Sequence, residues 1–495
     1  MKFKLGFARP VVLGPNFNQG RKVRKPVSRF VIPALGILLA LFFGLAAAVL
    51  PWQFLVGIAG LPLLLLIGLA FPLPIFAISL LLMFGLVPEF IMAALPLGGA
   101  ALRPPELMLI FLFVVVGFKS LVQGVSLVAP LKQIKVLLFV LALGLFLGVL
   151  KGKFVSHNVL AMADARQFVG WLALPISIWF LSTKPEVLHK LVIGIAILSA
   201  VLMLAQLALG VQLIFGFRGA ETLGTEFRDV TRSAIGGGLF FLAYAAYSLF
   251  LSACHSEKNR LIYLVGCILA IGGVVASFNR GVWAGFVLCA LLLLVFKPKT
   301  RHGFLMPLVA LLLMVSIGLA GLFVAKPRVA DAMLSRVLSL QEEGKRGSSL
   351  GFRFEENSQA VEAIRKNPLL GVGMGGEYKH AYRQLGVGGG FDTENSYIHN
   401  GYLSLWLKLG LMGAIIPVAL LYFVGKGFAN VAKNRSTEVP VEHKLKCLSA
   451  VAAIALSFVS ALTSPDWSTM GQLAAFSIFI AILIVPVKAG ADVRA

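Results

Sequence analysis

The polar residues best suited to chemistry lie directly before a long apolar run in the carboxyl-terminal part of the chain. Asn395, Tyr397, His399 and Asn400 precede the apolar run from Tyr402 to Gly425. An imidazole transfers protons near neutral pH, and neighbouring amides and hydroxyls recognise oxygen atoms. The pattern predicts proton transfer or oxygen recognition at a membrane boundary. His399 is either the base or hydrogen-bond partner of an acceptor hydroxyl, or a buried structural histidine at a helix start.

A polar interval, residues 326–401, leads into these residues. It carries ten Lys and Arg against nine Asp and Glu, so we interpret it as a nearly neutral folded cap. Within it, Phe354, Val361 and Ile364 fall at helical spacing with charged residues between them, which predicts an amphipathic helix lying on an apolar surface. Asn367-Pro368 is expected to end this helix, because a residue before proline is pushed out of the α region.

Two glycine runs follow, GVGMGG at 371–376 and GVGGG at 386–390, with His380, Tyr382 and Arg383 between them. The first run formally satisfies G-x-G-x-x-G, but it does not open a helix after a buried strand, so dinucleotide binding is not predicted. We expect a turn that brings backbone close to a polar ligand or to the membrane surface. No nucleotide-binding lysine motif, HExxH motif or close aspartate pair is present, which predicts chemistry without a metal or cofactor.

Arginines mark three further places. Arg280, in SFNRGVW, separates two apolar runs by almost nothing, so it is expected at a membrane boundary, where a charge is costly unless it snorkels, is paired or is functional. Arg228 and Arg232 belong to a basic loop, residues 211–234. Arg166 lies beside Asp164, and the two either pair with each other or bind ligand.

The composition defines the class of protein around these residues. Hydrophobic residues make up 59% of the chain and charged residues 13%, and the mean hydropathy is +0.91, which excludes a soluble globular protein. The net charge of +23 is explained by basic cytoplasmic loops rather than by nucleic-acid binding. All four cysteines lie in apolar runs or at their edges, so no disulfide is indicated.

Apolar runs of span length predict an all-α polytopic membrane protein with about 14 transmembrane helices (12–14). The expected spans are 30–50, 53–71, 73–90, 106–122, 134–150, 168–182, 188–210, 235–253, 261–278, 281–296, 304–325, 402–425, 446–463 and 470–487. The predicted organisation is a basic amino-terminal tail (1–29), eleven spans (30–325), one large loop containing short helices (326–401), three spans (402–487) and a short tail (488–495).

The short basic loops predict the orientation. Lysine and arginine concentrate in the even-numbered connections, such as 183–190, 255–260, 297–301 and 426–446, which the positive-inside rule assigns to the cytoplasm. Both termini are then cytoplasmic. The large loop, Arg166, the 211–234 loop and Arg280 all come to the opposite, periplasmic face, where they can build one site.

Several of these stretches together resemble a known family. NPLLGVGMG followed by HNGYLSLWLKLGLMG, the span junction SFNRGVWAGF and the segment GTEFRDVTRSAIGGG are similar to the O-antigen ligase and polymerase superfamily of bacterial surface-polysaccharide glycosyltransferases. The detailed likeness covers residues 352–415 and the two arginine-bearing segments. Two positions depart from the family pattern: Lys408 stands where an acidic residue is frequent, and Arg232 follows Arg228 in place of an Asn-rich turn.

The resemblance implies a GT-C-type, metal-independent, inverting glycosyltransferase in the bacterial inner membrane. Its donor would be an undecaprenyl-diphosphate-linked glycan, and its acceptor a glycan, lipid A-core or another molecule, with polysaccharide assembly or export proteins as further partners. Arg280 and Arg228 would hold the lipid diphosphate, with Arg232 as the alternative to Arg228 and Arg166 as a further ligand. His399 would engage the acceptor hydroxyl, with Asn400, Tyr397, His380 and Arg383 as acceptor-side residues.

The reaction is left between two outcomes. A polymerase joins repeat units and a ligase attaches a finished glycan; the number of spans and the basic amino-terminal tail favour a polymerase slightly. A flippase or exporter of lipid-linked sugars is the alternative from another class, but it predicts charges in the middle of several spans and internal symmetry. A non-catalytic assembly scaffold would tolerate loss of His399.

Overall fold

The structure is a computed structural model. It describes residues 65–87, 91, 95–97, 100–215, 218–222, 230–295, 301–338, 349–382, 391–395, 398–433 and 440–485. The predicted amino-terminal tail, the first expected span, most of the second and the carboxyl-terminal tail therefore lie outside the described residues.

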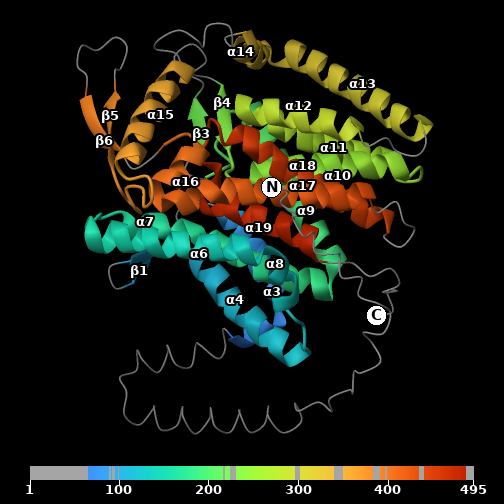
Figure 1. Cartoon of the computed structure of the whole chain (residues 1–495). Helices are drawn as coiled ribbons and strands as arrows, with labels where there is room; N and C mark the ends of the chain where they lie inside the picture. The colour runs from blue at the N-terminus through green and yellow to red at the C-terminus, as the bar shows by residue number, and fades with distance from the viewer. Residues whose placement is uncertain are drawn as a thin grey trace, which may run out of the picture. The chain divides into compact units, whose positions relative to one another are not determined.

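The described residues are predominantly helical, as predicted (Figure 1). The helices are α3 (Pro72–Met83), α4 (Pro104–Gln123), α5 (Val128–Leu131), α6 (Lys135–Val149), α7 (Ala161–Ala165), α8 (Ala173–Thr183), α9 (Pro185–Leu209), α10 (Gly238–His255), α11 (Arg260–Ala276), α12 (Arg280–Val295), α13 (Arg301–Ala325), α14 (Pro327–Leu338), α15 (Ser349–Lys366), α16 (Gly401–Leu409), α17 (Leu411–Lys433), α18 (Val441–Ser460) and α19 (Met470–Ile484). Shorter helical turns cover Lys132–Ile134, Leu150–Val155, Arg166–Leu172 and Asp466–Ser468.

Seven helices are long and apolar enough to cross a membrane, counted over the part of the chain that the structure describes. They start at Pro104, Val128, Pro185, Gly238, Phe304, Leu411 and Val441, and four shorter apolar helices accompany them. Length and composition thus give a multi-pass membrane protein. The total of about 14 spans and the side on which each loop lies stay predictions.

Helices α10 and α18 lie at the centre of the bundle. About 78% of the α10 span and 67% of the α18 span are buried, whereas the share in the α9 span is 39%. The two helices contact each other; α10 also packs on α9 and α11, and α18 on α12 and α19. The outer helices expose apolar side chains such as Phe113 and Phe139, as expected of surfaces that face lipid.

The span predicted over 402–425 is divided in two, which corrects the prediction. Helix α16 ends at Leu409, Gly410 takes a positive φ of 62°, and α17 begins at Leu411. The backbone of Leu369 lies against Gly410, and the Leu411 N–H donates to the Leu369 carbonyl at 2.9 Å. A side chain at position 410 would collide with that carbonyl, so glycine is required for the break.

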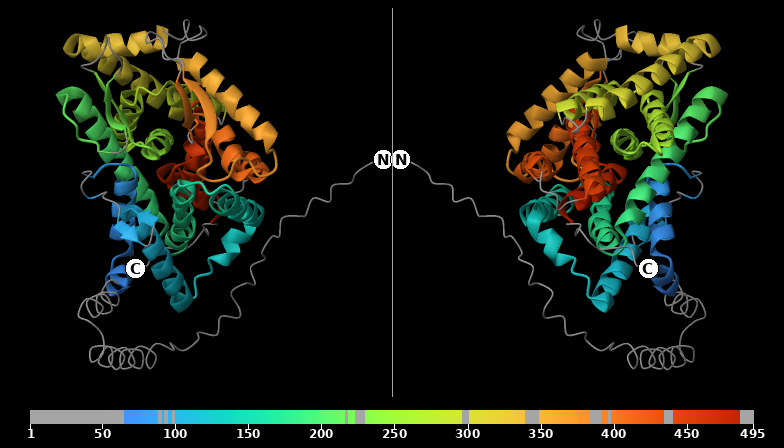
Figure 2. Two further views of the ribbon diagram at one scale, coloured as in Figure 1. Left: turned by 90° about the vertical axis from the view of Figure 1, so that its left-hand side faces the viewer. Right: turned by 90° about the vertical axis from the view of Figure 1, so that its right-hand side faces the viewer.

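Three antiparallel hairpins accompany the helices, and the sequence analysis did not predict them. Strands β1 (Leu95–Leu97) and β2 (Ala100–Leu102) pair, as do β3 (Arg218–Thr222) with β4 (Thr231–Ala234), and β5 (Tyr378–Tyr382) with β6 (Phe391–Asn395). The loop predicted to contain short helices contains two helices, α14 and α15, and in addition one hairpin. The side views in Figure 2 show α15 and the β5–β6 hairpin, both in orange, against each other.

Candidate functional site

His399 lies directly before α16 and faces a buried carboxylate. Its Nδ1 is 3.1 Å from Glu356 Oε2 and 3.2 Å from Oε1, and its backbone N–H donates to Glu356 Oε2 at 3.1 Å. The Glu356 side chain is 1% exposed and the His399 side chain 25% exposed. The carboxylate therefore fixes the ring from inside the protein, while part of the imidazole stays accessible.

This contact selects one tautomer of the neutral imidazole. A neutral ring that donates its Nδ1 proton to Glu356 carries its lone pair on Nε2, where a proton can be accepted. The same arrangement of carboxylate, imidazole and accepting nitrogen orients the base in many hydrolases and transferases. The predicted role of His399 as a base thus acquires a partner that the sequence analysis had treated only as a polar residue on the helix.

Tyr378, the first residue of β5, completes the surroundings of Glu356. The tyrosine side chain is 4% exposed and donates a hydrogen bond to the Glu356 carboxylate. Burial, together with the charge and the hydrogen bond of Glu356, raises the pKa of Tyr378 well above its usual value. The phenol therefore stays protonated and remains a donor at any physiological pH.

Helix α15 presents Glu356 inward, and the predicted apolar face is partly wrong. Ala360 and Ile364 are buried, and with Glu356 they recur every fourth residue on one face. Phe354, predicted to be on the buried face, is 67% exposed. Ala360 and Ile364 pack with Tyr378, Ile398 and Leu407 in one apolar cluster. A carboxylate belongs to the buried face because His399 and Tyr378 supply its hydrogen bonds.

Asn400 caps α16. Its Oδ1 accepts hydrogen bonds from the backbone N–H groups of Tyr402 at 3.0 Å and Leu403 at 3.1 Å. Gly401 donates its N–H to the Ala461 carbonyl at 2.7 Å, which fixes the helix start on the end of α18. The described contacts give Asn400 a structural task one residue from His399, and its predicted acceptor-side role stays a prediction.

Arg280 begins α12 and lies against the same end of α18. The preceding Phe278 is 1% exposed and takes a positive φ of 50°, and Asn279 Oδ1 accepts from the Val282 N–H at 3.3 Å. A methyl group at Gly281 would lie 2.7 Å from Thr463 Oγ1, so no side chain separates the helix start from the α18 end.

The turn 460–464, which follows α18, therefore joins the two segments. Gly401 contacts it at Ala461, and Gly281 contacts it at Thr463. Residues two apart in a helical turn lie within about 6 Å of each other. The segments that carry Arg280 and His399, over a hundred residues apart in the chain, thus meet on one short turn.

The start of the second strand of the β3–β4 hairpin lies near the neighbours of Arg280 in one apolar cluster. Val230, directly before β4, belongs to the same apolar cluster as Phe278, and Trp283 packs against that cluster. Residues on both sides of Arg280 thus share one cluster with a residue of the 211–234 loop. Arg228 lies outside the described residues. Arg232 lies on β4 opposite Glu221. In Figure 1 the hairpin, in green, stands between α15 and the start of α12.

Gln206, on α9, holds the approach to this hairpin. Its amide is fully buried, donates to Ser233 Oγ at 2.7 Å and accepts from the N–H groups of Leu213 and Ile214. Gln206 was not among the predicted site residues. A glutamine in the last turn of an apolar helix is the only sequence signal that could have found it.

Arg166 and Asp164 do not pair with each other; each has a different charged partner. Arg166 Nε is 3.5 Å from Glu106 Oε1, whose side chain is 1% exposed. Asp164 Oδ2 is 2.9 Å from Lys408 Nζ and also accepts from the Gly375 N–H at 2.9 Å. The pairing alternative is therefore wrong, and binding of ligand by Arg166 stays a prediction.

The remaining predicted site residues are placed only in part. Tyr397 and Arg383 lie outside the described residues. His380 lies on β5 opposite Thr393. Over the described ranges no group of three or more His, Cys, Asp or Glu side chains is arranged to hold a metal ion.

The first glycine run lies close to protein backbone, and the predicted approach to a polar ligand or to the membrane surface stays a prediction. Gly375 has a φ of 66° and lies against the backbone of Leu160 and Ala161. Met374 donates its N–H to the Gly148 carbonyl at 3.0 Å and accepts from Asn158 Nδ2 at 3.0 Å. The run therefore docks the polar interval on the end of α6, and its glycines are needed for close backbone contact.

Part of the chain is similar to a known protein family. Residues 265–418 match the family model described as O-Antigen ligase. These residues form an O-antigen ligase family domain. The family predicted from the motifs is thereby confirmed over this range, and the ligase-family domain contains Arg280, Glu356 and His399. Arg166, Arg228 and Arg232 precede it.

One similar protein extends the likeness beyond this range. An uncharacterized protein of Haemophilus influenzae is 28% identical over 242 residues, which cover 46% of this chain and 57% of that protein. The chain thus spans little more than half of the length of this relative. The ligase-family domain supports a membrane glycosyltransferase of the ligase or polymerase type.

Proposed function

We propose that the protein is an inner-membrane glycosyltransferase that transfers or polymerises undecaprenyl-diphosphate-linked oligosaccharide at the periplasmic face. The observation that carries the proposal is the meeting of Arg280 and His399 segments on the turn 460–464, inside or against a domain that matches the O-antigen ligase family. Residues 326–401 would then be a periplasmic cap, and both termini would be cytoplasmic, as the basic loops predict.

In the proposed reaction, His399 accepts the proton and the arginines stabilise the leaving group. The acceptor hydroxyl oxygen attacks the anomeric carbon while its proton passes to His399 Nε2. The bond from that carbon to the diphosphate oxygen breaks, and the electron pair leaves with the lipid diphosphate. Attack opposite the leaving group inverts the anomeric centre. Glu356 keeps the imidazole in the accepting tautomer and stabilises the imidazolium that forms.

Guanidinium groups suit the leaving group. A diphosphate carries roughly two to three negative charges, and arginine provides planar, bidentate contacts that strengthen at a low-dielectric boundary. Arg280 is the first candidate because it begins α12 beside the α18 end. Arg228 or Arg232 is the second because the hairpin packs on Phe278. These contacts replace the divalent metal of other phosphate-transferring sites, so the proposed reaction is metal-independent.

Polymerase is favoured slightly over ligase. The acceptor is the difference: a growing glycan for a polymerase, and lipid A-core or another finished acceptor for a ligase. Cells that lack the protein distinguish them, because a missing polymerase leaves single lipid-linked repeat units and a missing ligase leaves long unattached chains. Accumulation of neither species would contradict both reactions.

The proposal is tested in membranes supplied with purified lipid-linked donor. We expect Arg280→Ala and His399→Ala each to abolish product at unchanged protein level. His255→Ala is the matched control, because His255 lies at the end of α10 and bonds to the Leu251 carbonyl of its own helix at 2.9 Å. Full product from both site variants would end the proposal.

A further inference from the structure

A pocket separate from the candidate site lies at the other end of the helical segments that begin near Arg166 and Glu106. It is a cavity of about 530 Å³ between the start of α3, the end of α4, and the junction of α8 with α9. Lys119 follows Glu106 by thirteen residues on α4, or about 20 Å at the helical rise. The pocket and the Arg166–Glu106 pair are thus separated along α4 by much of the thickness of a bilayer.

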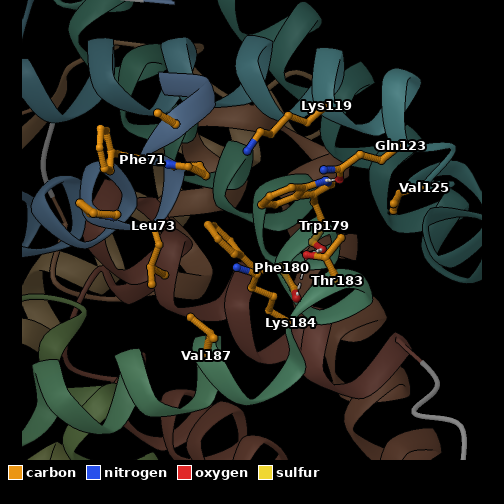
Figure 3. A pocket seen from close by; sticks show the side chains of 13 residues that line it. Phe71, Leu73, Lys119, Gln123, Val125, Trp179, Phe180, Thr183, Lys184 and Val187 are labelled. Carbon is orange, nitrogen blue, oxygen red and sulfur yellow. Dashed lines mark hydrogen bonds between the residues drawn. The ribbon is translucent and has the colours of Figure 1, made fainter. Parts of the chain in front are cut away.

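The walls of the pocket are apolar and aromatic. Phe71 and Leu73 line one side, and Trp179 and Phe180 the other, as Figure 3 shows. The Trp179 N–H donates to Gln123 Oε1 at 3.2 Å, which fixes the indole. Such walls accept the upper part of a hydrocarbon chain.

Two lysines add positive charge. Lys119 Nζ lies 5.2 Å from the centre of the Trp179 ring, and Lys184 enters the pocket from the start of α9. None of the lining side chains that the structure describes is acidic. The carboxylate nearest in sequence, Glu186, is bonded by Lys446 at 2.5 Å, so Lys446 neutralises it.

We propose that this pocket binds the phosphate headgroup of an anionic membrane lipid, with the phosphate between Lys119 and Lys184 and the first part of an acyl chain against Phe71 and Trp179. Cations at the end of a helical bundle, next to an apolar wall, match the chemistry of a glycerophospholipid rather than of a soluble anion. Basic pockets between transmembrane helices recognise anionic headgroups in this way. The basic loops predict that this face is cytoplasmic, where anionic lipid is attracted to lysine and arginine.

The test titrates the purified full-length protein in detergent with phosphatidylglycerol whose acyl chains carry bromine, and follows quenching of tryptophan fluorescence. We expect saturable quenching that Trp179→Phe removes and that phosphatidylcholine of the same chains does not reproduce. Lys119→Gln with Lys184→Gln is expected to weaken the apparent affinity about 30-fold, since each surface lysine contributes roughly a factor of five.

Two controls keep the result interpretable. Lys119→Arg with Lys184→Arg retains both charges and is expected to bind within about threefold of the wild type, which separates charge from misfolding. Lys190→Gln removes an exposed lysine of α9 outside the pocket and should leave binding unchanged.

Three results would overturn the assignment. Equal quenching by phosphatidylglycerol and phosphatidylcholine would remove the role of the lysines. Competition by millimolar inorganic phosphate with no dependence on the acyl chain would make the pocket a free-phosphate site. Quenching unaffected by Trp179→Phe would place the lipid elsewhere on the protein.

Discussion

The two ends of α16 carry two charged or ionisable pairs that differ in exposure. Before the helix, His399 is 25% exposed and its partner Glu356 is 1% exposed. At the end of the helix, the side chains of Lys408 and Asp164 are 9% and 18% exposed, and Lys408 Nζ lies 2.9 Å from Asp164 Oδ2. The backbone N–H of Gly375 donates a further hydrogen bond to the same carboxylate oxygen. One pair leaves an imidazole accessible to a ligand, and the other closes a contact between α16 and the end of α7.

The candidate site and a structural contact thus lie at opposite ends of one short helix. A buried carboxylate beside a partly exposed base orients that base for proton transfer. A nearly enclosed lysine and aspartate mainly hold elements together, because either partner left alone inside the protein is costly. The first arrangement predicts effects on rate and the second predicts effects on stability.

The largest effect is expected at the closed end of α16, where Lys408 pairs with Asp164. Lys408→Met leaves Asp164 without its cation, so we expect a loss of about 3 kcal/mol of stability, seen as a lower thermal midpoint in detergent. Adding Asp164→Asn should recover most of that loss, because no buried charge then remains unpaired. Lys426→Met, at an exposed position of α17, is the control. An unchanged midpoint for Lys408→Met would show that this pair does not hold α16.

At the open end of α16, where His399 pairs with Glu356, the expected effect is on the rate of the reaction. Glu356→Gln keeps the shape of the side chain but removes the charge that stabilises imidazolium, so turnover should fall about 100-fold with little change in the KM for donor. The matched control is Glu362→Gln on the same helix, where the carboxylate is 68% exposed and pairs with Lys366 at 3.0 Å. Equal activity of the two variants would break the distinction between the ends of α16.

Removal of the Asn400 helix cap tests how far the open end depends on the start of α16. Asn400→Ala leaves two N–H groups at the start of α16 without their acceptor and should cost about 1 kcal/mol of stability. Asn400→Asp retains an accepting oxygen and should restore the thermal midpoint. A rate loss in Asn400→Asp equal to that of Asn400→Ala would instead assign the amide a direct part in acceptor binding.

The smallest effect is expected from metal removal. If arginines alone balance the diphosphate charge, dialysis against EDTA should leave the rate within about twofold, since no Lewis acid is lost. The measurement is product formed from purified lipid-linked donor before and after chelation. Loss of activity that added Mg²⁺ or Mn²⁺ restores would show that the open end also needs a metal ion.

The helices were predictable because apolar runs of span length leave few alternatives in a membrane. Predicted runs such as 106–122 and 188–210 correspond to α4 and α9 within a few residues. The break at Gly410 was missed because it depends on the carbonyl of Leu369, which approaches from forty residues away in the sequence.

The candidate site was predictable at the level of residue type but not of pairing. His399 and Arg280 stood out because an imidazole and a guanidinium are unusual beside apolar runs. Glu356 did not stand out, since a glutamate between apolar helix positions is ordinarily a solvated residue. Its burial depends on Tyr378 and His399, and no periodicity along α15 contains that information. The pairing of Asp164 with Lys408 could not be predicted for the same reason, since the two residues come together only in the folded chain.

The turn 460–464 has a consequence for motion. Because the starts of α12 and α16 both contact this turn, we expect a tilt or shift of α18 to move the two helix starts together. If the proposed transfer takes place here, we expect Arg280 and His399 to keep their mutual alignment while the surrounding helices move. We therefore expect the outer helices to move more than the two helix starts that contact this turn.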